Sequence, residues 1–103
     1  MLLKNQDGTV TIEGQIVDVR DGSKKISRTY TYGYRSIRVL VDSEYYSVLV
    51  STSHLNKYGF LPKIGQWIRV TGLLSHSKEG LYDPSISHLQ NLEHIEPPNK
   101  HKI

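Results

Sequence analysis

The chain of 103 residues contains no cysteine and no alanine, and it has one tryptophan, one phenylalanine and one methionine. Without cysteine it forms no disulfide framework, no thiolate metal site and no thiol nucleophile. No run approaches the 18 apolar residues of a membrane-spanning helix. Residues 1–7 lack the basic start and apolar centre of a signal peptide. We therefore expect one cytoplasmic domain with no membrane contact and no cofactor.

The missing alanine also bears on fold class. Alanine is the best helix former, whereas the chain has eight valines, nine isoleucines, six threonines and seven tyrosines. These β-branched and aromatic residues favour strands. The composition therefore predicts an all-β domain.

Alternating apolar residues predict where the strands lie. Ile37, Val39 and Val41 are expected to face a core. After a turn at residues 42–44, Tyr46, Val48 and Val50 are expected to face the same core. A change of period near Gly14 predicts a bulge there. Strands are expected over residues 10–20, 29–41, 45–51, 67–74 and 81–95. The last strand is expected to be interrupted near residue 84 or around residues 90–91.

Two connections have sequence signals of their own. Residues 21–25 read as a turn, and we expect the loop from Asp21 to Thr31 to be mobile and to become ordered on binding. Residues 53–60 are expected to form one or two helical turns that begin with Ser53 as N-cap and end at Gly59.

Positive charge is concentrated in one segment. Residues 20–38 contain six cations, Arg20, Lys24, Lys25, Arg28, Arg35 and Arg38, and one acid, Asp21, for a net charge of 6 − 1 = +5. The whole chain carries +3, so the remainder carries 3 − 5 = −2. A basic segment on a near-neutral body is typical of a protein that contacts a polyanion. The alternative is a charged loop that keeps the chain soluble.

Two segments resemble a known superfamily. Residues 10–16 as an opening strand, and residues 61–72 as a turn leading into a strand that ends at Gly72, resemble the oligonucleotide/oligosaccharide-binding (OB) fold. The resemblance implies a five-stranded Greek-key barrel with a short helix between the third and fourth strands. It spans residues 9–96, with a lead-in at residues 1–8 and a tail at residues 97–103.

The resemblance implies a binding surface on the second and third strands, flanked by the loops that join strands 1–2 and 4–5. Cations there would contact phosphates and tyrosines would stack on bases. We expect single-stranded nucleic acid as the partner, DNA slightly favoured over RNA, with weak sequence preference. The residues expected in this surface are Lys24, Lys25, Arg28, Tyr30, Tyr32, Tyr34, Arg35, Arg38, Tyr45, His76, Lys78 and Tyr82.

Other interpretations stay open. The tyrosines are also good strand residues that pack across strands or against a partner chain, so the domain is alternatively a protein-interaction module or a homo-oligomer subunit. Trp67 is expected to cap the core rather than to stack on a base. The five histidines have no ligand spacing, and no catalytic motif accompanies the carboxylates, so neither a metal site nor an enzyme is expected.

Overall fold

The computed structural model describes residues 1–25, 27–29, 31–76, 80 and 82–97, and of residues 23–25, 31 and 32 it describes the backbone alone. The elements found in these residues are β1 (Leu2–Lys4), β2 (Val10–Lys25), β3 (Thr31–Val41), β4 (Glu44–Ser51), α1 (Thr52–Tyr58), β5 (Trp67–Ser75) and β6 (Ser85–His94). The protein is therefore mostly β, as the composition predicts.

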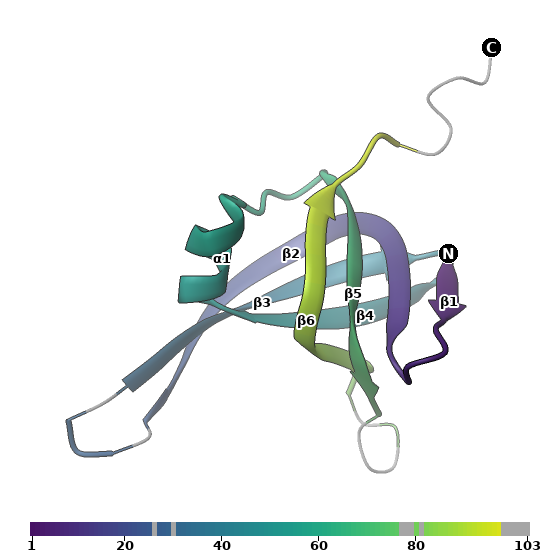
Figure 1. Ribbon diagram of the computed structural model, residues 1–103. Helices are drawn as coiled ribbons and strands as arrows, with labels where there is room; N and C mark the ends of the chain where they lie inside the picture. The colour runs from purple at the N-terminus through teal and green to yellow at the C-terminus, as the bar shows by residue number, and fades with distance from the viewer. Residues whose placement is uncertain (26, 30, 77–79, 81, 98–103) are drawn as a thin grey trace.

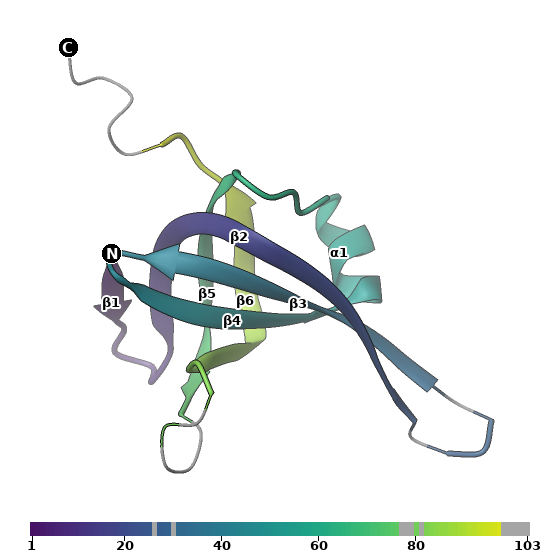
Figure 2. The same cartoon turned by 180° about the vertical axis from the view of Figure 1, so that it is seen from behind.

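The strands form one sheet that closes on itself (Figures 1 and 2). The strand order is β1-β2-β3-β4-β6-β5, and a further pairing of β2 with β5 completes the ring. All neighbours are antiparallel except β4 and β6, which pair in parallel through Ser47–Ser85 and Val48–Ile86. Closure leaves the apolar faces of the strands inside and their alternate side chains on the outer surface.

The interior contains the residues that alternation predicts. Ile37, Val39 and Val41 of β3 are at most 3% exposed, and Val48 and Val50 of β4 are equally buried. The rest of the core is Val10, Ile12, Ile16, Tyr46, Leu55, Phe60, Ile68, Val70, Ile86, Leu89 and Leu92. Because branched aliphatic residues from every long strand meet there, the closed sheet has one continuous core.

Strand β2 pairs with β5 over residues 10–15 and with β3 over residues 15–25, so it turns a corner of the closed sheet. The register shifts between Ile16 and Asp18, so the strand contains the predicted bulge, about three residues after Gly14. Gly14 instead allows a close approach. A Cβ atom there would collide with the backbone oxygen of Leu40 and with the Val39 and Val41 side chains.

Strands β2 and β3 continue past the closed sheet as a two-stranded arm (Figures 1 and 2). The prediction of a turn at residues 21–25 is therefore wrong, and so is that of a loop from Asp21 to Thr31, because residues 21–25 pair with residues 31–35. The turn signal came from Gly22. In the sheet this glycine lies opposite Tyr34, whose ring occupies the space of the missing side chain, with its Cζ atom 2.5 Å from an ideal Cβ position. Such aromatic–glycine pairs keep a glycine within a strand.

Helix α1 connects β4 to β5 and lies at the end of the closed sheet. Its N-cap is Ser51, whose Oγ accepts from the backbone N–H of His54 at 3.2 Å, so the prediction of Ser53 as N-cap is wrong. Ser53 lies inside the first turn and its hydroxyl contacts that of Ser51. The prediction that Gly59 ends the helix is confirmed, since Gly59 adopts a left-handed φ of 62°. This helix is not long and apolar enough to cross a membrane, and no other helix lies in the described residues.

Two further differences concern the ends of the domain. Strand β1 in the lead-in was not predicted; its three residues pair with Val10, Thr11 and Ile12. The last strand begins after Pro84, where one of the two predicted interruptions lies. Its register shifts between Ser87 and Asn91, close to the other predicted interruption at residues 90–91, and His88 in this stretch has a φ of 52°. Strand β1 was not predicted because its three residues are too few to show an alternating pattern.

Candidate functional site

The outer face of β2, β3 and β4 carries three of the residues predicted to bind a ligand, namely Arg38, Tyr45 and, on the arm, Tyr34. Register places Asp18, Arg38 and Ser47 in one row across the three strands, because Arg38 lies opposite both other residues. The next row contains Arg20, Ser36 and Leu49. Alternation turns these side chains away from the core, so this face is available for binding.

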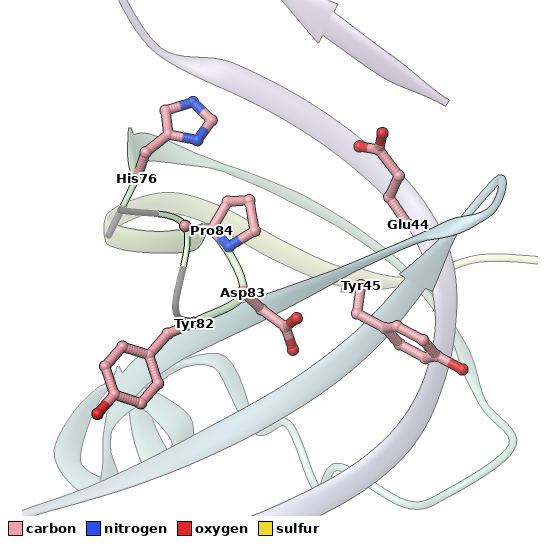
Figure 3. A pocket seen from close by; sticks show the side chains of 7 residues that line it. Glu44, Tyr45, His76, Tyr82, Asp83 and Pro84 are labelled. Atoms are coloured by element: carbon pink, nitrogen blue, oxygen red, sulfur yellow. The ribbon is translucent and has the colours of Figure 1, made fainter. Parts of the chain in front are cut away.

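A hollow of about 440 Å³ lies where the start of β4 faces the connection between β5 and β6 (Figure 3). Tyr82 is 77% exposed and Tyr45 is 39% exposed, and in Figure 3 their rings lie on opposite sides of the Asp83 carboxylate. The lining residues are Glu44, Tyr45, His76, Gly80, Tyr82, Asp83 and Pro84. We call this the tyrosine hollow.

A second hollow of about 230 Å³ lies on the strands themselves. It is lined by Asp18, Arg20, Ser36, Arg38, Ser47 and Asp83, and we call it the arginine hollow. Asp83 borders both hollows. Its Oδ2 atom lies 2.9 Å from Nε of Arg38, so this ion pair joins the β5–β6 connection to β3.

Arg38 also contacts an aromatic ring. Its guanidinium carbon lies 4.0 Å from the centroid of the Tyr45 ring, within the range of a cation–π contact. At an exposed site such a contact contributes about 0.5–1 kcal/mol. Together with the ion pair to Asp83, it holds the Arg38 head group at the boundary between the two hollows.

Three arginines of the basic segment 20–38 have acidic partners. Arg20 pairs with Asp18 at 2.8 Å and Arg35 pairs with Asp21 at 3.0 Å, besides the pair of Arg38. Partly exposed pairs of this kind contribute about 0–1 kcal/mol to stability. The face is therefore closer to charge balance than the sequence segment 20–38 suggests, because Asp18 and Asp83 lie outside that segment.

Glu44 is held at the rim of the tyrosine hollow by its neighbour in β4. The buried Tyr46 hydroxyl donates to Oε2 of Glu44 at 3.2 Å. Burial raises the pKa of Tyr46, and the hydrogen bond to Glu44 raises the pKa further. Tyr46 therefore stays a protonated donor at neutral pH and orients the Glu44 carboxylate.

Some of the predicted site residues come together and others do not. Arg38, Tyr45, His76 and Tyr82 gather at the two hollows. Tyr34 lies on the arm, on the same face of β3 as Arg38, whereas alternation places Arg35 on the opposite face. The backbones of Lys24, Lys25 and Tyr32 lie in the arm, and Arg28 is exposed near its tip. Tyr30 and Lys78 lie outside the described residues.

Sequence reasoning missed the acidic residues of the site. Glu44 lies in the turn expected at residues 42–44, whereas Asp18 and Asp83 lie in the strands expected over residues 10–20 and 81–95, and none was expected beside the cations. The dipeptide Tyr82-Asp83 in the connection before the last strand was the available signal, since the resemblance places that connection at the binding surface.

The described residues offer little for metal chemistry. They contain no group of three histidine or carboxylate side chains that could hold a metal ion. His94 stacks on Phe60 at a centroid distance of 4.2 Å, and His54 contacts the Tyr58 ring edge-on. What the site offers is a set of charged and aromatic side chains around two open hollows, which suits non-covalent binding.

A different part of the surface supplies a useful comparison. Arg69 of β5 pairs with Glu13 of β2 and Glu93 of β6, at 2.5 and 2.7 Å. The hydrogen bonds that Arg69 donates to these two carboxylates, to Glu93 first, raise the pKa of Arg69. Arg69 is about as exposed as Arg38 and lines neither hollow.

Comparison of the sequence with protein-family models and with curated proteins found no match.

Proposed function

We propose that this chain is an OB-fold domain that binds single-stranded nucleic acid, DNA slightly favoured over RNA, across the outer face of β2, β3 and β4. The proposal of an OB fold is supported by the strand order, in which β2, β3, β4, β6 and β5 close on β2, and by the helix between β4 and β5. Domains of that fold bind oligonucleotides on their second and third strands and the adjoining loops.

The observation that carries the proposal is the Arg38–Tyr45 contact at the boundary of the two hollows. Binding of single strands needs cations that follow the phosphates and exposed rings on which bases stack. Arg38 and Arg20 are the cations of this face, and Tyr45 and Tyr82 are its exposed rings. Tyr34 extends the row of rings along the arm. The other predicted contacts stay predictions, namely Lys24, Lys25, Arg28, Tyr30, Tyr32, Arg35, His76 and Lys78.

The ion pairs of this face are compatible with phosphate binding. Arg38 and Arg20 each have a partly exposed carboxylate partner. Because a guanidinium has five N–H donors, each arginine can bind a phosphate while it stays paired with its carboxylate, and the pair itself is worth only about 0–1 kcal/mol. Binding is non-covalent, and because stacking tolerates every base, sequence preference along the arm is weak.

Fluorescence anisotropy with labelled oligomers of thymidine and of uridine tests the proposal. Log K should fall linearly with log salt, by about 0.7 per phosphate contact, between about 50 and 200 mM. Tighter binding of the thymidine oligomer supports DNA as the ligand. No anisotropy change with micromolar protein at low salt would contradict the proposal.

A second function, a protein-interaction module, is favoured by one observation. Leu61 and Ile64, between α1 and β5, are 59% and 68% exposed, and apolar side chains so exposed suit a protein partner. If oligomers fail to bind while Leu61→Ser and Ile64→Ser change the self-association seen by analytical ultracentrifugation, this second function is supported.

A further inference from the structure

The tyrosine hollow differs chemically from the rest of the proposed binding face. Its described lining contains two carboxylates, Glu44 and Asp83, and neither lysine nor arginine. Phosphate groups are repelled from such a lining, whereas a neutral ring with hydrogen-bond donors at its edge is not. At about 440 Å³ the hollow has the size of a small-molecule site.

We propose that the tyrosine hollow binds a guanine base, so that the protein selects guanine at one position of the strand that it holds. This inference rests on the proposed function, since the guanine belongs to a bound single strand. It adds one selective position to a face that otherwise tolerates every base.

Tyr45 provides the surface on which the base stacks. Arg38 lies over the Tyr45 ring and lines the arginine hollow, but it does not line the tyrosine hollow. The guanidinium covers one face of the Tyr45 ring, and the base stacks on the other face. A base stacked there has its neighbouring phosphate within reach of the arginine hollow, where Arg20 and Arg38 supply positive charge.

Asp83 provides the selectivity. A carboxylate only accepts hydrogen bonds, and the Watson–Crick edge of guanine has two adjacent donors, N1–H and the N2 amino group. Adenine and cytosine present one donor beside an acceptor, and thymine presents one donor between two carbonyl oxygens. The Asp83 carboxylate is 33% exposed, and its ion pair with Arg38 fixes its position, so the carboxylate is oriented before the base arrives.

The first experiment uses the unmodified protein and labelled thymidine oligomers of about 12 nucleotides. The central nucleotide is thymidine, guanosine, inosine, adenosine or cytidine, and anisotropy gives the affinity of each. The guanosine oligomer should bind about 5- to 100-fold more tightly than all-thymidine. Inosine lacks the N2 amino group and should lose most of that gain.

The outcomes separate the two proposals. If all five oligomers bind with equal affinity, or if inosine equals guanosine, the guanine site is wrong while nucleic-acid binding stands. If none of them binds, the proposed function itself fails. Because these comparisons need no variant, they do not depend on the folding of a mutant.

The second experiment tests Asp83 directly. Asp83→Asn should bring the guanosine and all-thymidine affinities to near equality, because the amide has one acceptor oxygen where the two guanine donors need two. Glu93→Gln is the matched control, since Glu93 is a half-exposed carboxylate that also pairs with an arginine but lines neither hollow. Retention of the guanosine preference in Asp83→Asn would overturn the proposal.

Discussion

The guanidinium carbon of Arg38 lies 4.0 Å from the centroid of the Tyr45 ring, and this contact joins the two hollows of the outer face. Arg38 is on β3 and Tyr45 on β4, two strands that the β3–β4 hairpin holds in fixed register. A cation and a ring are thus held side by side before any ligand is present. Preorganisation of this kind lowers the entropy that binding costs.

Replacement of Tyr45 by alanine should weaken binding of a thymidine oligomer by about 1–3 kcal/mol, because one base loses its stacking surface. Tyr58→Ala is the matched control. Tyr58 is 36% exposed, close to the 39% of Tyr45, but it lies on α1 and lines neither hollow. Anisotropy titrations measure both variants. Equal affinities in the two variants would show that Tyr45 is not a stacking platform.

Arg38→Gln should reduce the slope of log K against log salt by about 0.7, because one phosphate contact is lost. The control is Arg69→Gln, which removes an arginine of similar exposure from a different part of the surface. Titrations at several salt concentrations give the slopes. An unchanged slope in Arg38→Gln would mean that this guanidinium contacts no phosphate.

Gly14→Ala should destabilise the protein by about 1–3 kcal/mol, since the added methyl group meets the Leu40 carbonyl oxygen and two core valines. Gly33→Ala is the control, because a Cβ there would meet only Thr52, at 3.5 Å, which is ordinary contact. Urea unfolding measures both. Equal stability of the two variants would contradict the close approach of β2 to β3 at Gly14.

Ser51→Ala should cost about 0.5–2 kcal/mol, because α1 loses its N-cap hydrogen bond to the His54 N–H. Ser53→Ala should cost less, since Ser53 lies within the first turn of the helix. Thermal and urea unfolding compare the two variants. A larger loss in Ser53→Ala would restore the sequence-based assignment of the N-cap.

Asp7 should make stability depend on pH. The Thr9 hydroxyl and the Thr9 backbone N–H donate to Oδ1 of Asp7, at 2.6 and 3.0 Å, and these bonds lower the pKa of Asp7 below its ordinary value of 3.8. Because the folded state lowers the pKa, the stabilisation is present above pH 3.8 and is lost as pH falls through the folded pKa. Asp7→Asn should therefore be less stable than the parent at neutral pH and equal to it in acid, by urea unfolding. A difference that is constant with pH would contradict this.

The sequence predicts the fold well where burial alone decides. Ile37, Val39, Tyr46 and Val48 alternate strictly, and each is buried as expected, because a side chain on the inner face of a closed sheet must be apolar. It fails where a tertiary contact overrides a local signal. Gly22 reads as a turn residue, yet the Tyr34 ring from the neighbouring strand keeps it in β2.

The site was predicted in part. Arg38 and Tyr45 follow from strand alternation and the basic segment, whereas their acidic neighbours do not. Asp83 lies 45 positions from Arg38 in the sequence, and only closure of the sheet brings the two together. Charge counted along a segment therefore overestimates the positive charge of the folded surface.

The central claim is that the outer face of β3 and β4, around Arg38 and Tyr45, holds single-stranded nucleic acid. Titration of isotope-labelled protein with a thymidine oligomer, followed by amide chemical shifts, tests this most directly. We predict the largest shifts at Arg38, Tyr45 and Tyr82, with α1 unchanged. Shifts confined to α1 and residues 61–66, or no shifts at saturating oligomer, would contradict it.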